Sequence, residues 1–164
     1  MTMKKDEVKA VERYRKAALQ GEAKAQVNLG NSYRHGRGVE KDEVEAVKWY
    51  LKAAEQGDAD AQYNLGNSYR HGQGVEMDEV EAVKWFRKAA LQGDAKAQNN
   101  LGNSYYNGRG VEKDEVEAYK WFLLAGAQGH ENAKKGMALL EKELDAAGRR
   151  EGQKRAREWK PGKP

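Results

Sequence analysis

Small and apolar residues recur along the chain at intervals of four, and polar residues occupy most positions between them. In residues 58–71 the apolar positions are Ala61, Leu65 and Tyr69. Because an α-helix turns once in about 3.6 residues, these positions lie on one face of a helix. A similar stripe of alanine and aromatic residues runs through residues 78–92. The pattern therefore predicts two amphipathic helices, each of which buries one narrow face.

The two predicted helices belong to a unit of 36 residues that repeats along the chain. When residues 37–72 are aligned with residues 73–108, 27 of the 36 positions are identical. Glycine marks the same step at Gly21, Gly57, Gly93 and Gly129. A single helix pair cannot bury its apolar face alone, so a unit repeated in register predicts that successive pairs stack on one another.

Residue types beside the stripes predict where each helix begins and ends. Asp42, Asp78 and Asp114 stand where an N-cap carboxylate accepts a hydrogen bond from an open backbone N–H group. A glycine follows the last turn, where a left-handed residue is expected. Gly66, which recurs at positions 30 and 102, lies inside the first predicted helix, although glycine costs about 1 kcal/mol there relative to alanine. We therefore expect a close helix crossing that leaves no room for a Cβ atom.

Together these positions give the pattern A-x-x-x-L-G-x-x-Y-x-x-G-x-G-V-x-x-D-x-x-x-A-x-x-W-[YF]-x-x-A-A-x-x-G, which resembles the Sel1-like repeat family, a relative of the tetratricopeptide repeat (TPR). The resemblance covers about residues 6–130. It implies an all-α fold, an αα-superhelix or right-handed TPR-like solenoid of about nine helices. It also implies a role as an adaptor that holds other proteins together. Residues 151–161 resemble the closing helix of bacterial members.

We expect a single solenoid domain over residues 1–164. Its expected parts are an N-terminal capping helix over 6–20, repeats over 22–57, 58–93 and 94–129, C-terminal capping helices over 130–160 and a tail over 161–164. The first helix matches only the second half of a unit and has Arg13 where later copies have tryptophan, as an end that faces solvent requires. Gly148 and Gly152 weaken the final helix, so it must rely on packing. The expected contacts are Met137, Leu140, Leu144 and Trp159.

No arrangement of catalytic or metal-binding residues recurs with the repeat. Ser32 and Ser68 lie three residues before His35 and His71, a spacing that could suggest a nucleophile and its base. The third copy has Asn107 in place of the histidine, and no orienting carboxylate occupies matching positions. The chain has no cysteine, and its acidic runs lack the spacing of an EF-hand. We therefore expect no enzyme activity, no catalytic residue, no metal and no cofactor.

The aromatic residues are expected in the core. Trp49, Trp85 and Trp121 are each followed by Tyr or Phe, and we interpret them as packing residues rather than as an aromatic platform for a ligand. A stack of helix pairs has a thin core of Ala, Leu, Tyr and Trp. This explains why only 38% of the residues are hydrophobic.

The net charge of +4 arises in the C-terminal segment. Residues 148–164 contain seven of the 30 Lys and Arg residues but two of the 26 Asp and Glu residues, whereas the remainder carries 23 basic and 24 acidic side chains. The repeats are thus nearly neutral, and we do not expect nucleic acid as the partner. No apolar run could span a membrane. No signal peptide follows Met1, which places the protein in the cytoplasm if the chain is complete, and in the periplasm or outside the cell if a signal peptide was trimmed.

In TPR-type solenoids the first helix of each pair lines a concave surface, and the resemblance implies the same placement here. The side chains expected to face that surface are Asn28, Asn31, Arg34, Tyr63, Asn64, Asn67, Arg70, Asn99, Asn100, Asn103 and Tyr106. An amide both donates and accepts hydrogen bonds, so the asparagines can pair with a peptide backbone of any sequence. Asparagines in two of these places match those that hold ligand backbones in peptide-binding TPR domains. Ladders of asparagine can also hydrogen-bond one another between repeats, and this alternative stays open.

We therefore expect a monomeric interaction module that binds a peptide or a segment of a protein partner in the concave groove. Arg34 and Arg70 could hold a carboxylate of that partner. The copies are unusually alike, which leaves a second hypothesis, a consensus-like or designed scaffold with no dedicated ligand. A third is binding of nucleic acid or another anionic surface through the basic C-terminal segment.

Overall fold

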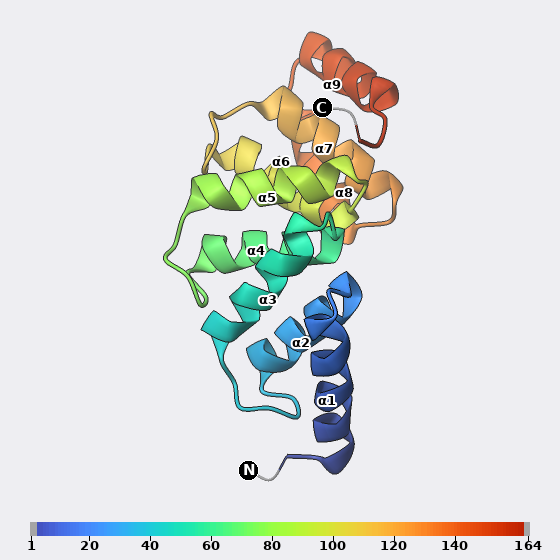
Figure 1. Ribbon diagram of the computed structural model, residues 1–164. Helices are drawn as coiled ribbons and strands as arrows, with labels where there is room; N and C mark the ends of the chain where they lie inside the picture. Colours follow the sequence, from blue (N-terminus) through green and yellow to red (C-terminus); the bar gives the residue numbers. More distant parts are fainter. Residues whose placement is uncertain (1–2, 163–164) are drawn as a thin grey trace. The chain divides into compact units, whose positions relative to one another are not determined.

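The computed structural model describes residues 3–162, and these residues form nine α-helices and no β-strand (Figure 1). The helices are α1 Lys5–Leu19, α2 Ala23–His35, α3 Glu43–Glu55, α4 Ala59–His71, α5 Glu79–Leu91, α6 Ala95–Asn107, α7 Glu115–Ala127, α8 Glu131–Glu143 and α9 Ala146–Glu158. The all-α content predicted from the sequence is confirmed. The two helices predicted over residues 58–71 and 78–92 correspond to α4 and α5.

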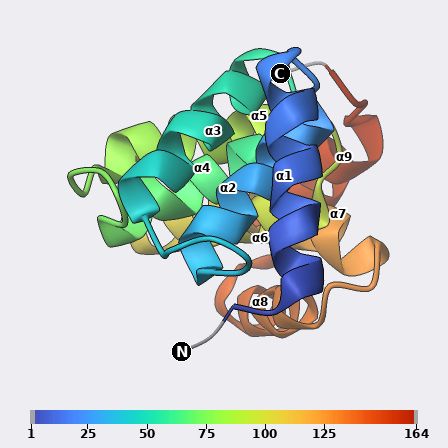
Figure 2. The same cartoon turned by 60° about the horizontal axis from the view of Figure 1, so that its bottom comes forward.

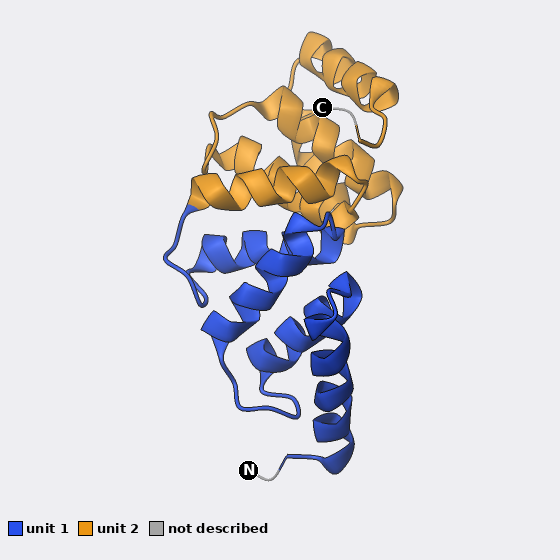
Figure 3. Ribbon diagram, viewed as in Figure 1, with its two compact units in different colours: residues 1–78 blue, residues 79–164 orange. Residues whose placement is uncertain are grey.

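The helices divide between two compact units, α1–α4 in residues 1–78 and α5–α9 in residues 79–164 (Figure 3). In the first unit α2 packs on both α1 and α3, and α3 packs on α4. Figures 1 and 2 both show α1 running alongside α2. In the second unit α6 packs on α5 and α7, and α7 also contacts α8 and α9. We call α2, α4 and α6 the first helices of the repeats and α3, α5 and α7 the second helices.

Aspartate side chains cap several of the helices, as the sequence predicts. Oδ1 of Asp42 accepts the backbone N–H of Glu45 at 2.9 Å, and Oδ1 of Asp114 accepts that of Glu117 at 2.9 Å. Asp58 begins α4 in the same way. Each cap satisfies one of the open N–H groups of the first turn and contributes about 1 kcal/mol to helix stability.

A glycine at the crossing of a first and a second helix brings the two helices into contact, as predicted. A Cβ atom at Gly30 in α2 would lie 2.7 Å from Cε1 of Tyr50 in α3. A Cβ atom at Gly102 in α6 would lie 2.7 Å from Cε1 of Phe122 in α7. Both distances are too short for two carbon atoms, so these positions accept no side chain unless the aromatic ring moves.

The tryptophans are core residues, which confirms their interpretation from the sequence. Trp49 and Trp85 are each 7% exposed, and Trp121 is 1% exposed. A lysine lies over each ring, as in the contact of Lys52 Nζ with the Trp49 ring, whose centroid lies 4.4 Å away. Such a cation over an indole contributes about 0.5–1 kcal/mol at a partly exposed site. The thin interior is therefore closed by the aliphatic parts of basic side chains.

The last helix, α9, packs against the second helix α7. Gly152 is buried, and a Cβ atom there would lie 2.6 Å from Cδ1 of Tyr119. The Trp159 ring meets the Trp121 ring edge to face, with centroids 6.4 Å apart. Gly152, which weakens α9 by propensity, thus permits the close packing of α9 on α7. Met137, Leu140 and Leu144 join the apolar cluster beneath α7 and α8.

Candidate functional site

Ties at both ends hold the first helices α2 and α4 side by side. Near the start of the two helices, Nζ of Lys24 lies 2.6 Å from Oδ2 of Asp60 and 3.4 Å from Oδ2 of Asp58. In the last turn of α2, Nη2 of Arg34 donates a 3.0 Å hydrogen bond to Oε1 of Gln73, which follows the end of α4. The hydrogen bond with Asp60 also raises the pKa of Lys24. Equivalent residues on the two helices are consequently aligned.

Asn28 and Asn64 are an aligned pair of open carboxamides. They occupy equivalent positions on α2 and α4, and both are half-buried. Neither carboxamide has a hydrogen-bond partner among residues 3–162; the bonds at these two residues involve the backbone carbonyls, which accept from Ser32 and Ser68 Oγ at 3.0 and 3.1 Å. Their donors and acceptors are therefore available to a ligand. The two serine hydroxyls are bonded to the helix backbone instead of to a histidine.

Asn31 is bonded inside the protein. Its Oδ1 accepts the hydroxyl of Tyr50 at 2.7 Å, and burial of Tyr50 raises the pKa of that phenol. In the third copy Phe122 replaces the tyrosine and has no hydroxyl to donate. The Asn103 carboxamide there has no partner in the part of the chain that the structure describes. A carboxamide bonded to a tyrosine and an open carboxamide thus occur at equivalent positions of different copies.

The remaining candidates in the first unit are Tyr63, Asn67 and Arg70, all on α4. They are half-buried, and each takes part in an interaction inside the molecule. Arg34 uses one N–H group for Gln73 and keeps others, because a guanidinium carries five donors. The polar face of α4 is therefore a mixture of engaged side chains and the open Asn64.

In the second unit, the predicted binding residues of α6 differ from one another in burial and in hydrogen bonding. Asn99 is 6% exposed, and its Nδ2 donates at 3.5 Å to Oδ1 of Asn100, while its own buried Oδ1 has no partner among the described residues. The hydroxyl of Tyr106 donates to Oε1 of Glu143 in α8 at 3.1 Å. Asn103 is half-buried and open. On α6 a ligand thus reaches Asn103 and the edge of Asn100 more readily than Asn99.

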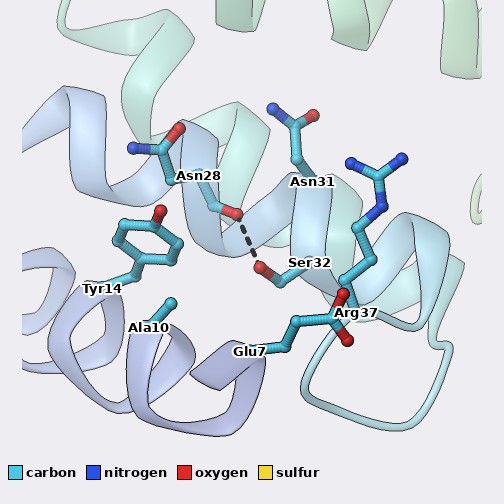
Figure 4. A pocket seen from close by; sticks show the side chains of 7 residues that line it. All are labelled: Glu7, Ala10, Tyr14, Asn28, Asn31, Ser32 and Arg37. Carbon is cyan, nitrogen blue, oxygen red and sulfur yellow. Dashed lines mark hydrogen bonds between the residues drawn. The ribbon is translucent and has the colours of Figure 1, made fainter. Parts of the chain in front are cut away.

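A pocket between α1 and α2 was not indicated by any sequence pattern. We call it the α1/α2 pocket; it has a volume of about 250 Å³ and is lined by Glu7, Ala10, Tyr14, Asn28, Asn31, Ser32 and Arg37 (Figure 4). Figure 4 shows Tyr14 and Ala10 rising from α1 and the two asparagines entering from α2. The available signal was Tyr14, an aromatic residue of the end helix at the position that the buried Tyr50 occupies one repeat later.

Both units are built from helix–loop–helix repeats that bury one face and present a polar face, which defines an α-helical repeat protein. The Sel1 repeat model matches residues 1–22, 23–58, 59–94 and 95–130, and the chain therefore belongs to the Sel1 repeat family. The solenoid of Sel1-like repeats that the sequence predicts is confirmed as its fold class. Sel1 repeats commonly serve in protein–protein interaction, and they are typically not enzymes.

Solved structures support the same assignment. The chain is 38% identical to c5321, a protective antigen of uropathogenic Escherichia coli strains with an SLR fold, with a TM-score of 0.85 over 91% of this chain and 32% of that chain. It is 38% identical to a Sel1 repeat protein from Oxalobacter formigenes, with a TM-score of 0.77 over 92% of this chain and 64% of that one. Helicobacter pylori cysteine rich protein B (hcpB) is 30% identical, with a TM-score of 0.64 over 82% of this chain and 96% of that one.

The chain thus spans about a third of the first of these structures and slightly under two thirds of the second. No curated protein matches it. None of the helices between residues 3 and 162 is long and apolar enough to cross a bilayer.

Proposed function

We propose that this protein is a non-enzymatic adaptor that binds an extended segment of a protein partner along the polar faces of α2 and α4 in its first unit. The observation that carries the proposal is the aligned pair Asn28 and Asn64. Two equivalent carboxamides stand open on neighbouring helices, while many polar side chains around them are bonded inside the protein. A polar group that is half-buried and unpaired is best satisfied by a ligand that brings both donors and acceptors.

The separation of the two helices suits a peptide backbone. Packed helices lie about 8–10 Å apart, and an extended chain advances about 3.3 Å per residue. Asn28 and Asn64 can therefore bond to backbone groups about three residues apart in an extended segment. A carboxamide that bonds the backbone places little demand on the side chains of the ligand.

Arg34 provides the charge preference of this surface. It lies on α2 and is anchored by its bond to Gln73, which holds the guanidinium in place before a ligand arrives. An anchored guanidinium with free N–H groups favours an acidic side chain or a terminal carboxylate. We therefore expect the bound segment to be extended and to contain an acidic residue.

The basic C-terminal segment supports this proposal better than it supports anion binding. Nη1 of Arg155 lies 3.0 Å from Glu117 Oε2, and its Nε lies 2.9 Å from Glu151. Nη1 of Arg149 donates to the carbonyl oxygen of Leu144 at 2.6 Å. The contacts with Glu117 and Leu144 fasten α9 to its neighbours, so part of the positive charge stabilises the fold.

Selection of peptides followed by a matched pair of variants tests the proposal. Peptides of twelve residues are selected from a displayed library on the wild-type protein, and the best binder is measured by calorimetry. We expect Asn28→Ala/Asn64→Ala to weaken it by about tenfold or more, since each lost pair of bonds is worth about 1 kcal/mol. Asn132→Ala, an exposed asparagine of α8, is the control and should leave the affinity unchanged. Equal affinity for the double variant and the wild type would contradict the proposal.

A further inference from the structure

The α1/α2 pocket repeats a place that is filled one repeat later. Adding 36 to the numbers of its lining residues gives Glu43, Ala46, Tyr50, Asn64, Asn67, Ser68 and Gln73, and six of these seven match their counterparts in residue type. The exception is Gln73, which corresponds to Arg37. The first unit therefore contains two versions of one surface.

In the second version the first helix α2 occupies the surface. Gly30 of α2 lies against the Tyr50 ring and the Ala46 carbonyl oxygen, and Asn31 Oδ1 accepts the Tyr50 hydroxyl. Arg34 of α2 donates to Gln73. Three counterparts of the pocket residues are thus contacted by one helix, through three residues spaced as Gly, Asn and Arg at positions 30, 31 and 34.

In the first version the same surface is open. Tyr50 is fully buried and Ala46 is 1% exposed, whereas their counterparts Tyr14 and Ala10 are only half-buried. No first helix precedes α1 within residues 3–162, and the Sel1 repeat model matches 22 residues there but 36 in each of the next three segments. The pocket is the space that the first helix of a repeat fills elsewhere in this unit.

We infer that the α1/α2 pocket is a docking site for one amphipathic α-helix of a protein partner, which packs a Leu-Gly-Asn sequence on Tyr14 and places an acidic residue beside Arg37. The Leu-Gly-Asn sequence is that of residues 29–31, which fit the equivalent surface. The glycine lies over the tyrosine ring, and the asparagine accepts its hydroxyl.

The acidic residue follows from the one difference between the two surfaces. Where α2 places Arg34 against the neutral acceptor Gln73, the docked helix meets the exposed cation Arg37, which forms no ion pair among the described residues. An arginine in that position of the partner would be repelled, and a glutamate would be attracted. The Leu-Gly-Asn sequences of a second copy are already packed, because Gly30 and Gly102 lie against aromatic rings and Gly66 is buried in α4.

This docking goes beyond the proposed function, because it concerns a helix at α1 rather than an extended segment along α2 and α4. The two share Asn28 and Asn31 as lining residues, so the tests must use residues that they do not share. Tyr14 and Arg37 belong to the pocket alone, and Asn64 belongs to the proposed peptide surface alone.

The test uses a labelled peptide with the sequence of residues 22–36 carrying Arg34→Glu, titrated with the full protein and followed by fluorescence anisotropy. We expect binding that weakens about fivefold with the unaltered Arg34 peptide. Gly30→Ala in the peptide should abolish binding, although alanine favours the helix, because its Cβ atom meets the Tyr14 ring. In the protein, Arg37→Gln should remove the preference for glutamate, and Asn64→Ala should leave the affinity unchanged.

A free peptide of this length is weakly helical in water, so weak binding alone would not contradict the inference. A second experiment therefore links the helix covalently to the protein. Residues 22–40, with the same Arg34→Glu change, are placed directly before Lys5, which reproduces the connection of α2 to α3 and raises the local concentration to about millimolar. Amide hydrogen exchange in α1 should slow, and Gly30→Ala in the added segment should cancel this effect.

Three results would overturn the inference. The first is a peptide with Gly30→Ala that binds as well as the peptide that keeps Gly30. The second is a linked helix that leaves exchange in α1 unchanged. The third is a protein that dimerises alone in sedimentation analysis and loses the dimer on Tyr14→Ala, which would assign the pocket to a second copy. The exposed variant Arg37→Gln covers the case in which Tyr14→Ala fails to fold.

Discussion

The hydroxyl of Tyr50 donates a 2.7 Å hydrogen bond to Oδ1 of Asn31, and it does so from a fully buried ring. This bond joins the first helix α2 to the second helix α3 beside the Gly30 crossing. It also fixes the orientation of a carboxamide whose equivalent in the third copy, Asn103, is open. The Tyr50 hydroxyl thus engages Asn31 inside the protein, whereas Phe122 offers Asn103 no such donor.

Replacing Tyr50 by phenylalanine should cost about 0.5–1.5 kcal/mol of unfolding free energy, the usual net value of such a bond. The ring keeps its place, because Phe122 occupies the equivalent position in the third copy. Urea denaturation measures the change. The reciprocal variant Phe122→Tyr supplies Asn103 with a donor and should not destabilise the protein. A Tyr50→Phe variant as stable as the wild type would show that the bond makes no net contribution.

The same residue predicts a dependence on alkaline pH. Burial raises the pKa of Tyr50 above its ordinary value of 10.0. The unfolded chain therefore releases the proton first, so the contribution of neutral Tyr50 is present below pH 10.0 and is lost as the pH rises through its raised pKa. As the pH rises above 10.0 the wild type should lose more stability than Tyr50→Phe. Parallel pH profiles of the two proteins would contradict this assignment.

Asn99→Val should stabilise the second unit by about 1–2 kcal/mol, because it removes a buried oxygen that has no partner among the described residues. The equivalent position in α2 holds Val27, which is 4% exposed, so the repeat already accepts valine there. Thermal or urea unfolding measures the gain. Asn132→Val, at an exposed site, controls for the general effect of a more apolar residue. A loss of stability would show that Asn99 is satisfied in solution.

Gly30→Ala should destabilise the first unit by about 1–3 kcal/mol through contact of the new methyl group with Tyr50. Alanine improves helix propensity by about 1 kcal/mol, so the clash has to exceed that gain. Gly126→Ala in α7 is the matched control. A Cβ atom there would lie 3.5 Å from the nearest atom, Cγ of Lys134, and the substitution should stabilise the protein. Stabilisation by both substitutions would mean that the Tyr50 ring moves freely aside.

Trp159→Ala should loosen α9 from α7. The lost edge-to-face contact with Trp121 is worth about 0.5–1.5 kcal/mol beyond the apolar area that becomes exposed. Amide exchange should increase first in α9, whose glycines give it little stability of its own. Arg157→Ala, which changes an exposed residue of the same helix, serves as the control. Unchanged exchange in α9 would show that Gly152 and Arg155 suffice to hold it.

Spacing along the chain predicted the helices closely. The stripe of Ala61, Leu65 and Tyr69 and the aspartate before it bounded a helix over residues 58–71, and α4 runs over Ala59–His71. The spacing of apolar residues and the N-cap aspartates depend only on neighbouring positions in the chain, so they can be read from the sequence. The glycine crossing was also predictable, because a residue that costs helix stability is retained where two helices touch.

Side-chain contacts between helices were harder to predict. Tyr50 and Phe122 differ by one hydroxyl and pack alike, and only Tyr50 can donate to the asparagine beside it. Asn99 has Val27 as its equivalent, and helical period does not tell how deeply a position beside a neighbouring helix is buried. The α1/α2 pocket lies between two helices that each follow the repeat pattern, and the pattern of a single helix does not tell how much space is left beside it.

Asp58 serves two partners at once. Its Oδ1 accepts the N–H of Ala61 in the first turn of α4, and its Oδ2 faces Nζ of Lys24 on α2. Fraying of that turn therefore also releases the tie between the two helices, and loss of the tie frees the turn to fray. The carboxylate thus couples the start of α4 to the alignment of Asn28 with Asn64 on the proposed binding face.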